Sequence, residues 1–161
     1  MSSSFVNHFF KVYNEPGKVQ SSIILIRLLL SAVFITEGIQ KFLFSDSLGV
    51  GRFIKIGIPA PGFFAPFVGV VEITCGMLIL LGFFTSLAAV PLIINMSVAI
   101  WTTKVPILQE SGFWKMAHEA RTDWAMILGL IFLLFTGGGK WSLDHLRLRH
   151  SVNVESHKTQ E

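Results

Sequence analysis

Long apolar stretches alternate with short polar segments along most of this chain. They predict helices over residues 22–44, 63–83, 87–103 and 122–135, the last of which is short and extended by the segment before it. A helix of about twenty apolar residues crosses the ~30 Å hydrocarbon layer of a bilayer at about 1.5 Å per residue. We therefore expect an all-α integral membrane four-helix bundle with both termini on the same side.

Turn-forming residues separate the predicted helices. Pro16-Gly17 predicts a break before the first helix, and the segment 49–62, rich in glycine and proline, separates the first helix from the second. Residues 82–86 predict a tight hairpin that carries no charge. Gly137-Gly138-Gly139 lacks the Lys-Ser/Thr of a phosphate-binding loop and predicts a helix end.

The composition favours a membrane protein over a soluble one. Hydrophobic residues make up 52% of the 161 residues and charged residues only 14%, which is too little charge to cover the surface of a soluble domain. We predict a polar N-terminal segment (1–21), a membrane domain (22–144) in contact with the lipid bilayer, and a polar, disordered tail (145–161). The basic residues are dispersed and lack interleaved stacking aromatics, which argues against nucleic-acid binding.

The orientation in the membrane depends on the lysine and arginine residues that flank the helices. Apart from Arg27, they divide equally between the two sides. The terminal side has Lys11, Lys18, Lys140, Arg147, Arg149 and Lys158; the other side has Lys41, Arg52, Lys55, Lys104, Lys115 and Arg121. Because several of the second set are candidates for inward-facing functional residues, we predict cytoplasmic termini.

Two carboxylates lie deep within the predicted spans. By helical rise, Glu37 is about 10 Å from the end of the first helix, and Glu72 is about 13 Å from the start of the second. Because these helices run antiparallel, both carboxylates lie at a similar depth, on the side away from the termini. Ionisable groups at such depth are unfavourable unless paired or hydrated, so both are candidate catalytic residues.

Further charged residues are predicted in the same half of the bundle. Lys41 is one turn from Glu37 and can pair with it. Lys104 ends the third helix on that side, and His118, Arg121 and Asp123 open the fourth. With Arg27, which lies nearer the terminal side, these residues form the candidate ligand-binding set.

Each of these residues also has a structural interpretation. Glu37 and Glu72 can form helix-locking ion pairs with Lys41 or Arg121, and Arg27, Lys41 and Lys104 can extend to the headgroups. His118 can be a plain interfacial residue. Asn95 is interpreted as a polar contact between helices, and the glycines at 69, 76 and 82 as sites of close helix packing.

No residue pattern for an intrinsic cofactor is found. Cys75 is the one cysteine and lies in an apolar stretch, so no metal site is predicted from Cys/His spacing. The predicted spans hold no histidine pair for a haem, and no Walker or GxGxxG motif is present. A redox role would therefore require a diffusible quinone or the cofactor of a partner protein.

Five short motifs resemble the DoxX family of small four-helix bacterial membrane proteins. They are Arg27–Leu30 leading into Glu37–Phe42, the loop Gly57–Pro61, Glu72 followed by Gly76 and Leu80–Gly82, Thr85 at the hairpin, and the closing run Gly137–Asp144. The resemblance covers residues 22–144. The family pattern often has arginine after the hairpin threonine, where this chain has Ser86.

The resemblance implies a redox-associated subunit of the bacterial inner membrane, without settled catalytic residues. Relatives include a subunit of a thiosulfate:quinone oxidoreductase and a membrane component of an assembly linked to oxidative stress and sulfur metabolism. We expect a subunit of a quinone-linked or sulfur/thiol redox complex, with a soluble or membrane redox partner protein. In this hypothesis Glu37 and Glu72 handle protons or a quinone oxygen, and Lys41 and Arg121 stabilise an anion.

Two other functions remain open from the sequence. A transporter of a small anionic or metal-bound solute would use the same polar residues but would also need an opening toward the termini, for which only Arg27 and Asn95 are candidates. A non-catalytic scaffold or assembly factor would recruit an enzyme through its connecting segments. A homodimer is also compatible with the apolar surface, which lipid covers equally well.

Overall fold

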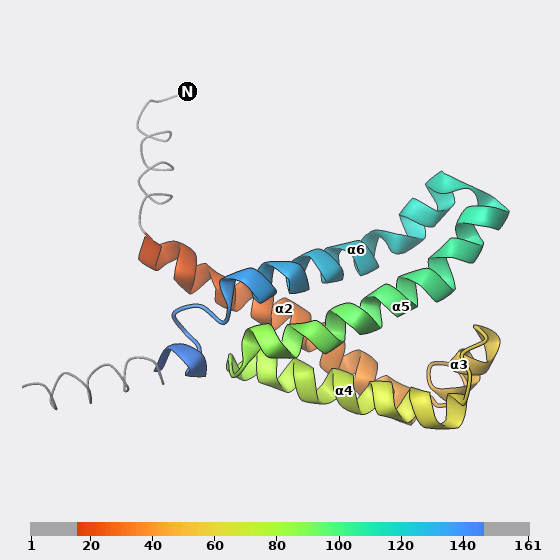
Figure 1. Ribbon diagram of the computed structural model, residues 1–161, viewed down its shortest axis with the longest axis horizontal. Helices are drawn as coiled ribbons and strands as arrows, with labels where there is room; N and C mark the ends of the chain where they lie inside the picture. Colours follow the sequence, from red (N-terminus) through yellow and green to blue (C-terminus); the bar gives the residue numbers. More distant parts are fainter. Residues whose placement is uncertain (1–15, 147–161) are drawn as a thin grey trace, which may run out of the picture.

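The computed structural model describes residues 16–146, and this part of the chain is helical, without strands. Four long helices make up the fold: α2 (Pro16–Leu43), α4 (Pro61–Leu81), α5 (Thr85–Ser111) and α6 (Phe113–Thr136). A short helix, α3 (Val50–Lys55), lies in the connection between α2 and α4 (Figure 1). The all-α prediction is confirmed for these residues. Most of the predicted terminal segments, 1–21 and 145–161, lies outside them.

Three helix boundaries differ clearly from the prediction. α2 begins at Pro16, where a break was expected, because the fixed φ of proline suits the first position of a helix. Residues 104–121, which lie between the third and fourth predicted helices, are mostly helical, since α5 continues through Pro106 to Ser111 and α6 begins at Phe113. Polar residues lower the hydropathy of such an extension without preventing a helix. α5 and α6 therefore form one long antiparallel hairpin that turns at Gly112 (Figure 1).

The connection between α4 and α5 is the tight hairpin expected at residues 82–86. Gly82 ends α4 in the left-handed region, with φ of 68°. Its N–H donates to the Ile79 carbonyl at 3.1 Å, and the Phe83 N–H donates to the Leu78 carbonyl at 2.9 Å. These two bonds form a Schellman motif, which favours glycine at the left-handed position.

The helices pack most closely as two pairs. α2 lies against α4 and α5 lies against α6, while the contacts of α4 with α5 and of α2 with α6 are fewer. The start of α2 and the end of α6 meet at the same end of the molecule (Figure 1), where the Lys140 N–H donates to the Gln20 carbonyl at 3.3 Å. An apolar core joins the four helices; it includes Leu30, Phe34, Cys75, Ile79, Leu92, Leu130 and Leu133.

The outer surface of the helices is strongly apolar. Leu25, Leu87 and Leu128 are each about two-thirds exposed, and many other large apolar side chains are exposed as well. Within residues 16–146, three helices are long and apolar enough to cross a membrane: α2 over Gln20–Leu43, α4, and α5. α6 is not among them, because its first half is rich in charged residues.

Candidate functional site

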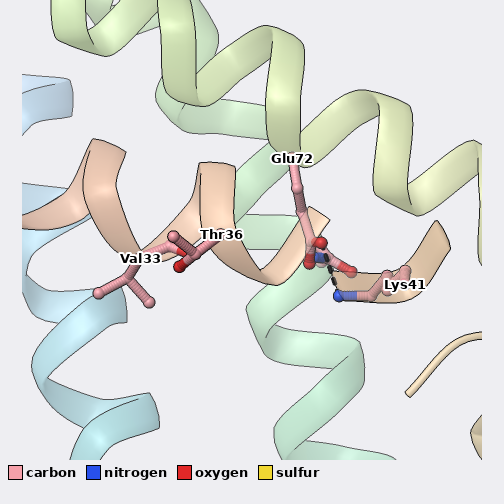
Figure 2. A network of polar contacts seen from close by, with 5 residues as sticks. Val33, Thr36, Lys41 and Glu72 are labelled. Atoms are coloured by element: carbon pink, nitrogen blue, oxygen red, sulfur yellow. Dashed lines mark hydrogen bonds and ion pairs between the residues drawn. The ribbon is translucent and has the colours of Figure 1, made fainter. Parts of the chain in front are cut away.

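A polar cluster joins three of the long helices. Glu72 in the middle of α4 is 4% exposed, and it points toward Lys41 of α2 (Figure 2). Its Oε2 accepts a hydrogen bond from Lys41 Nζ at 2.6 Å, and its Oε1 accepts one from Asn95 Nδ2 of α5 at 2.7 Å. We call Lys41, Glu72 and Asn95 the polar cluster.

Glycine residues bring α2 close enough to α4 for this contact. Gly69 and Gly76 lie three residues before and four residues after Glu72, on the same face of α4. A Cβ atom at Gly38 would lie 2.7 Å from the Gly69 carbonyl oxygen, and one at Gly76 would lie 2.8 Å from Ile35 Cγ1. The predicted packing role of Gly69 and Gly76 is confirmed, and Gly38 is the matching residue on α2.

In the polar cluster the two charges form an ion pair, and the Lys41 side chain keeps a small exposed surface. The Lys41 side chain keeps 12% of its surface exposed, against 5% for Glu72. A lysine ammonium has three N–H donors, and Lys41 uses one of them on Glu72. The cluster can therefore hold three helices together and still offer N–H groups to an oxygen ligand.

Glu37 lies one turn before Lys41 but does not pair with it. The carboxylate is exposed on the outside of α2, and within residues 16–146 it makes no hydrogen bond or ion pair. Of the two ion pairs that the sequence allowed for Lys41, the structure forms the one with Glu72 and not the one with Glu37, because Lys41 turns toward α4. Helical rise gave the depth of Glu37 along α2 but not the side on which its carboxylate lies.

Arg27 belongs to a separate buried site, 14 residues before Lys41 on α2, which is roughly 21 Å by helical rise. Its side chain is enclosed by backbone carbonyls, and the residue is 2% exposed. Nε donates to Ile79 (2.8 Å), Nη2 to Leu80 (2.6 Å), and Nη1 to Gly138 (3.0 Å) and Trp141 (2.6 Å). We call this arrangement the arginine clamp.

The arginine clamp holds the segment that follows α6 against the end of α4. In that segment Asp144 caps α5: its Oδ1 accepts from the Phe84 N–H at 2.9 Å, and its Oδ2 accepts from the Thr85 N–H at 3.2 Å. A carboxylate at a helix N-terminus is also attracted by the positive end of the helix dipole, and this attraction stabilises the helix. The carbonyls of residues 138 and 141 and the Asp144 cap were not predicted, because no hydrophobic pattern marks them.

The remaining predicted ligand-binding residues lie on α5 and α6. Lys104 Nζ forms an ion pair with Asp123 Oδ2 at 3.2 Å. His118 and Arg121 are exposed, and the Arg121 guanidinium donates to the His118 carbonyl at 2.6 Å. The structure therefore joins Lys104 to Asp123, and it leaves His118 and Arg121 outside the polar cluster.

Loss of the Lys104–Asp123 ion pair is expected to have a smaller effect than loss of a fully buried pair. The two side chains are 14% and 23% exposed, so water at the more exposed Asp123 screens part of the attraction. Asp123→Asn should lower the free energy of unfolding by about 1–3 kcal/mol, between the values typical of exposed and of buried pairs. Thermal unfolding of the purified protein in detergent measures the change. A loss as large as that of a buried pair would show that Lys104 lacks access to water.

Buried charges between long helices with an apolar outer surface define an integral membrane protein. The DoxX family model matches residues 22–105, and the chain belongs to the DoxX family. An uncharacterized membrane protein of Mycobacterium tuberculosis is 60% identical over 129 residues, which cover 76% of this chain and 79% of that protein. No solved structure matches the chain. The matched residues include Arg27, Lys41, Glu72 and Asn95, whereas the closing motif at 137–144 lies beyond them.

Proposed function

We propose that this protein is a four-span membrane subunit that binds a quinone headgroup at the polar cluster and works in a quinone-linked or sulfur/thiol redox complex. The main support is the geometry of Lys41, Glu72 and Asn95, a charged and amide-bearing cluster in an otherwise apolar bundle. Charged groups within spanning helices are unfavourable, and they commonly mark functional sites.

The proposed topology makes α6 the fourth span. α6 runs antiparallel along α5 and ends beside the start of α2, so a chain that crosses the bilayer in α5 returns through α6 (Figure 1). The second half of α6 buries Met126, Leu130 and Leu133 against the core. Both termini then lie on one side, which we assign to the cytoplasm of a bacterial inner membrane.

A quinone carbonyl fits the hydrogen-bonding groups of the polar cluster. Lys41 retains N–H donors beyond the one used on Glu72, and the Asn95 amide has a second N–H and a carbonyl. The aliphatic tail of a quinone would lie among the exposed apolar side chains of the helices. The carboxylate of Glu37 lies on the outside of α2, one helical turn before Lys41.

In this proposal the protein manages protons, and a partner supplies the electrons. Reduction of a quinone to a quinol takes up two electrons and two protons. Glu72 and Glu37 would each take up a proton from the aqueous side and pass it to a quinone oxygen, and the Lys41 ammonium would stabilise the anion formed before each proton arrives. The electrons would come from a redox partner protein, with a thiol or reduced sulfur compound as the source. The proposal gives no role to Arg121, whose guanidinium lies on α6 and donates to the His118 carbonyl of the same helix.

Glu37→Gln is the first test of the proposal. Because Glu37 is exposed and makes no hydrogen bond or ion pair within residues 16–146, the substitution should leave stability unchanged. Native mass spectrometry of protein extracted gently from its own membrane should find bound quinone in the wild type and about tenfold less in the variant, the equivalent of one hydrogen bond. Glu119→Gln, at an exposed glutamate of α6, is the matched control and should retain quinone. A wild-type protein without quinone, or equal retention in Glu37→Gln, contradicts the proposal.

A scaffold role is the second candidate, supported by the α5–α6 hairpin. At its tip Phe113 is 54% exposed and Trp114 is 84% exposed, among the charged residues Glu110 and Lys115. Crosslinking to one stoichiometric partner, with full function in Glu37→Gln, would favour this role. A transport role has less support, because Arg27 is bound to four carbonyls and apolar core residues lie between it and the polar cluster.

A further inference from the structure

The corner formed by α3 and the start of α4 combines unpaired positive charge with exposed aromatic rings. α3 is anchored by Phe53, which is 7% exposed, and it packs against α4. Arg52 and Lys55 point outward from α3, three residues apart and therefore on one side of the helix. Within residues 16–146 neither side chain makes a hydrogen bond or ion pair. Asp46, on the preceding turn, offsets one of these two charges, and the corner keeps a net positive charge.

The first turns of α4 add a flat aromatic surface beside these charges. Phe63 is 64% exposed and Phe67 is 52% exposed. Their rings stack with centroids 5.9 Å apart and planes at 10°. Farther along the same side of α4, Val70 is 54% exposed and Met77 is 42% exposed, so an apolar stripe continues from the rings toward the middle of the helix.

From these features we infer that the α3–α4 corner binds an anionic phospholipid, with the phosphate on Arg52 and Lys55 and an acyl chain along Phe63, Phe67 and Val70. Basic residues attract anionic headgroups, and aromatic rings favour the interface between headgroups and acyl chains. The order along the chain fits a lipid, because the charges precede α4 and the rings and aliphatic side chains follow at increasing depth. A free anion would use only the charges. This inference does not depend on quinone binding at the polar cluster.

The test uses the full-length protein in detergent with equal amounts of phosphatidylglycerol and phosphatidylcholine. Native mass spectrometry counts each lipid that remains bound. Two basic residues near the headgroup level should give phosphatidylglycerol a preference of about tenfold or more over phosphatidylcholine. The double variant Arg52→Gln/Lys55→Gln should lose this preference. Both side chains are exposed and unpaired, so the fold should be unaffected.

Two matched variants separate the parts of the inference. Lys115→Gln/Lys140→Gln removes two exposed charges elsewhere and should keep the preference. Phe63→Ala/Phe67→Ala should lower the retention of both lipids while leaving their ratio unchanged. No preference in the wild type, or equal loss in both charge variants, would overturn the inference. Displacement of the lipid by excess inorganic phosphate would overturn it too, because a phosphate site alone would then explain the binding.

Discussion

Arg27→Leu is expected to release the segment after α6 and to destabilise the whole bundle. The substitution removes donors from four carbonyl oxygens, two at the end of α4 and two in residues 137–141. Of these, the Ile79 oxygen keeps a second donor, the Gly82 N–H. Removing one side of a buried, charged hydrogen-bond network typically lowers stability by about 3–5 kcal/mol. The Asp144 cap of α5 lies in the released segment and should weaken with it.

Hydrogen exchange and thermal unfolding in detergent measure this effect. Backbone amides of residues 137–146 and at the start of α5 should exchange faster in Arg27→Leu, and the unfolding temperature should fall. Arg121→Leu is the matched control, since it removes one hydrogen bond from an exposed guanidinium and should change little. Arg27→Lys should recover only part of the loss, because one ammonium group cannot reach carbonyls on both sides as the planar guanidinium does. Unchanged exchange in Arg27→Leu would show that the segment is held by other contacts.

Glu72→Leu is expected to destabilise the bundle by a similar amount. It leaves the Lys41 ammonium in a largely buried position without its anion, and it removes the acceptor of the Asn95 amide. Loss of one partner of a buried ion pair typically lowers stability by about 3–5 kcal/mol. The yield of folded protein and its unfolding temperature in detergent give the size of the effect.

The double variant Lys41→Met/Glu72→Met separates stability from ligand binding. Replacement of both members of a buried ion pair by apolar residues of similar volume is often neutral for stability. The double variant should therefore be close to the wild type in unfolding temperature and more stable than Glu72→Leu, yet it should no longer retain quinone. Quinone retention equal to the wild type would contradict a ligand site at Lys41 and Glu72. If Glu72→Leu were as stable as the wild type, Lys41 would have access to water or to another partner.

The arginine clamp and the polar cluster differ in the kind of groups that they bind. The arginine clamp binds backbone carbonyls at the end of α4 and in the segment that follows α6, so its role is to hold these two parts of the chain together. The polar cluster uses side chains alone and retains N–H donors at Lys41. A ligand site is therefore better supported at the polar cluster than at Arg27.

Local rules predicted most of the helices. Apolar runs of membrane-spanning length identify α2, α4 and α5, since the hydrophobic effect acts on each run separately. Glycine in the left-handed conformation marks the end of α4 at Gly82, and Gly137 follows the end of α6 with φ of 68°. The polar, helical hairpin tip was missed, because hydropathy measures the preference for lipid and not the preference for helix.

For the candidate site, the sequence by itself determined that Lys41 and Glu72 lie at the same level along α2 and α4, but not which partner each one binds. Glu72 and Lys41 were placed in the same half of the bundle by helical rise alone. The sequence allowed Lys41 to pair with either Glu37 or Glu72. Lys41 pairs with Glu72 because α2 and α4 approach each other closely at Gly38 and Gly69. The carbonyl partners of Arg27 likewise come from segments more than 50 residues away. Pairing of this kind depends on which helix faces meet, and side-chain packing across the whole bundle determines those faces.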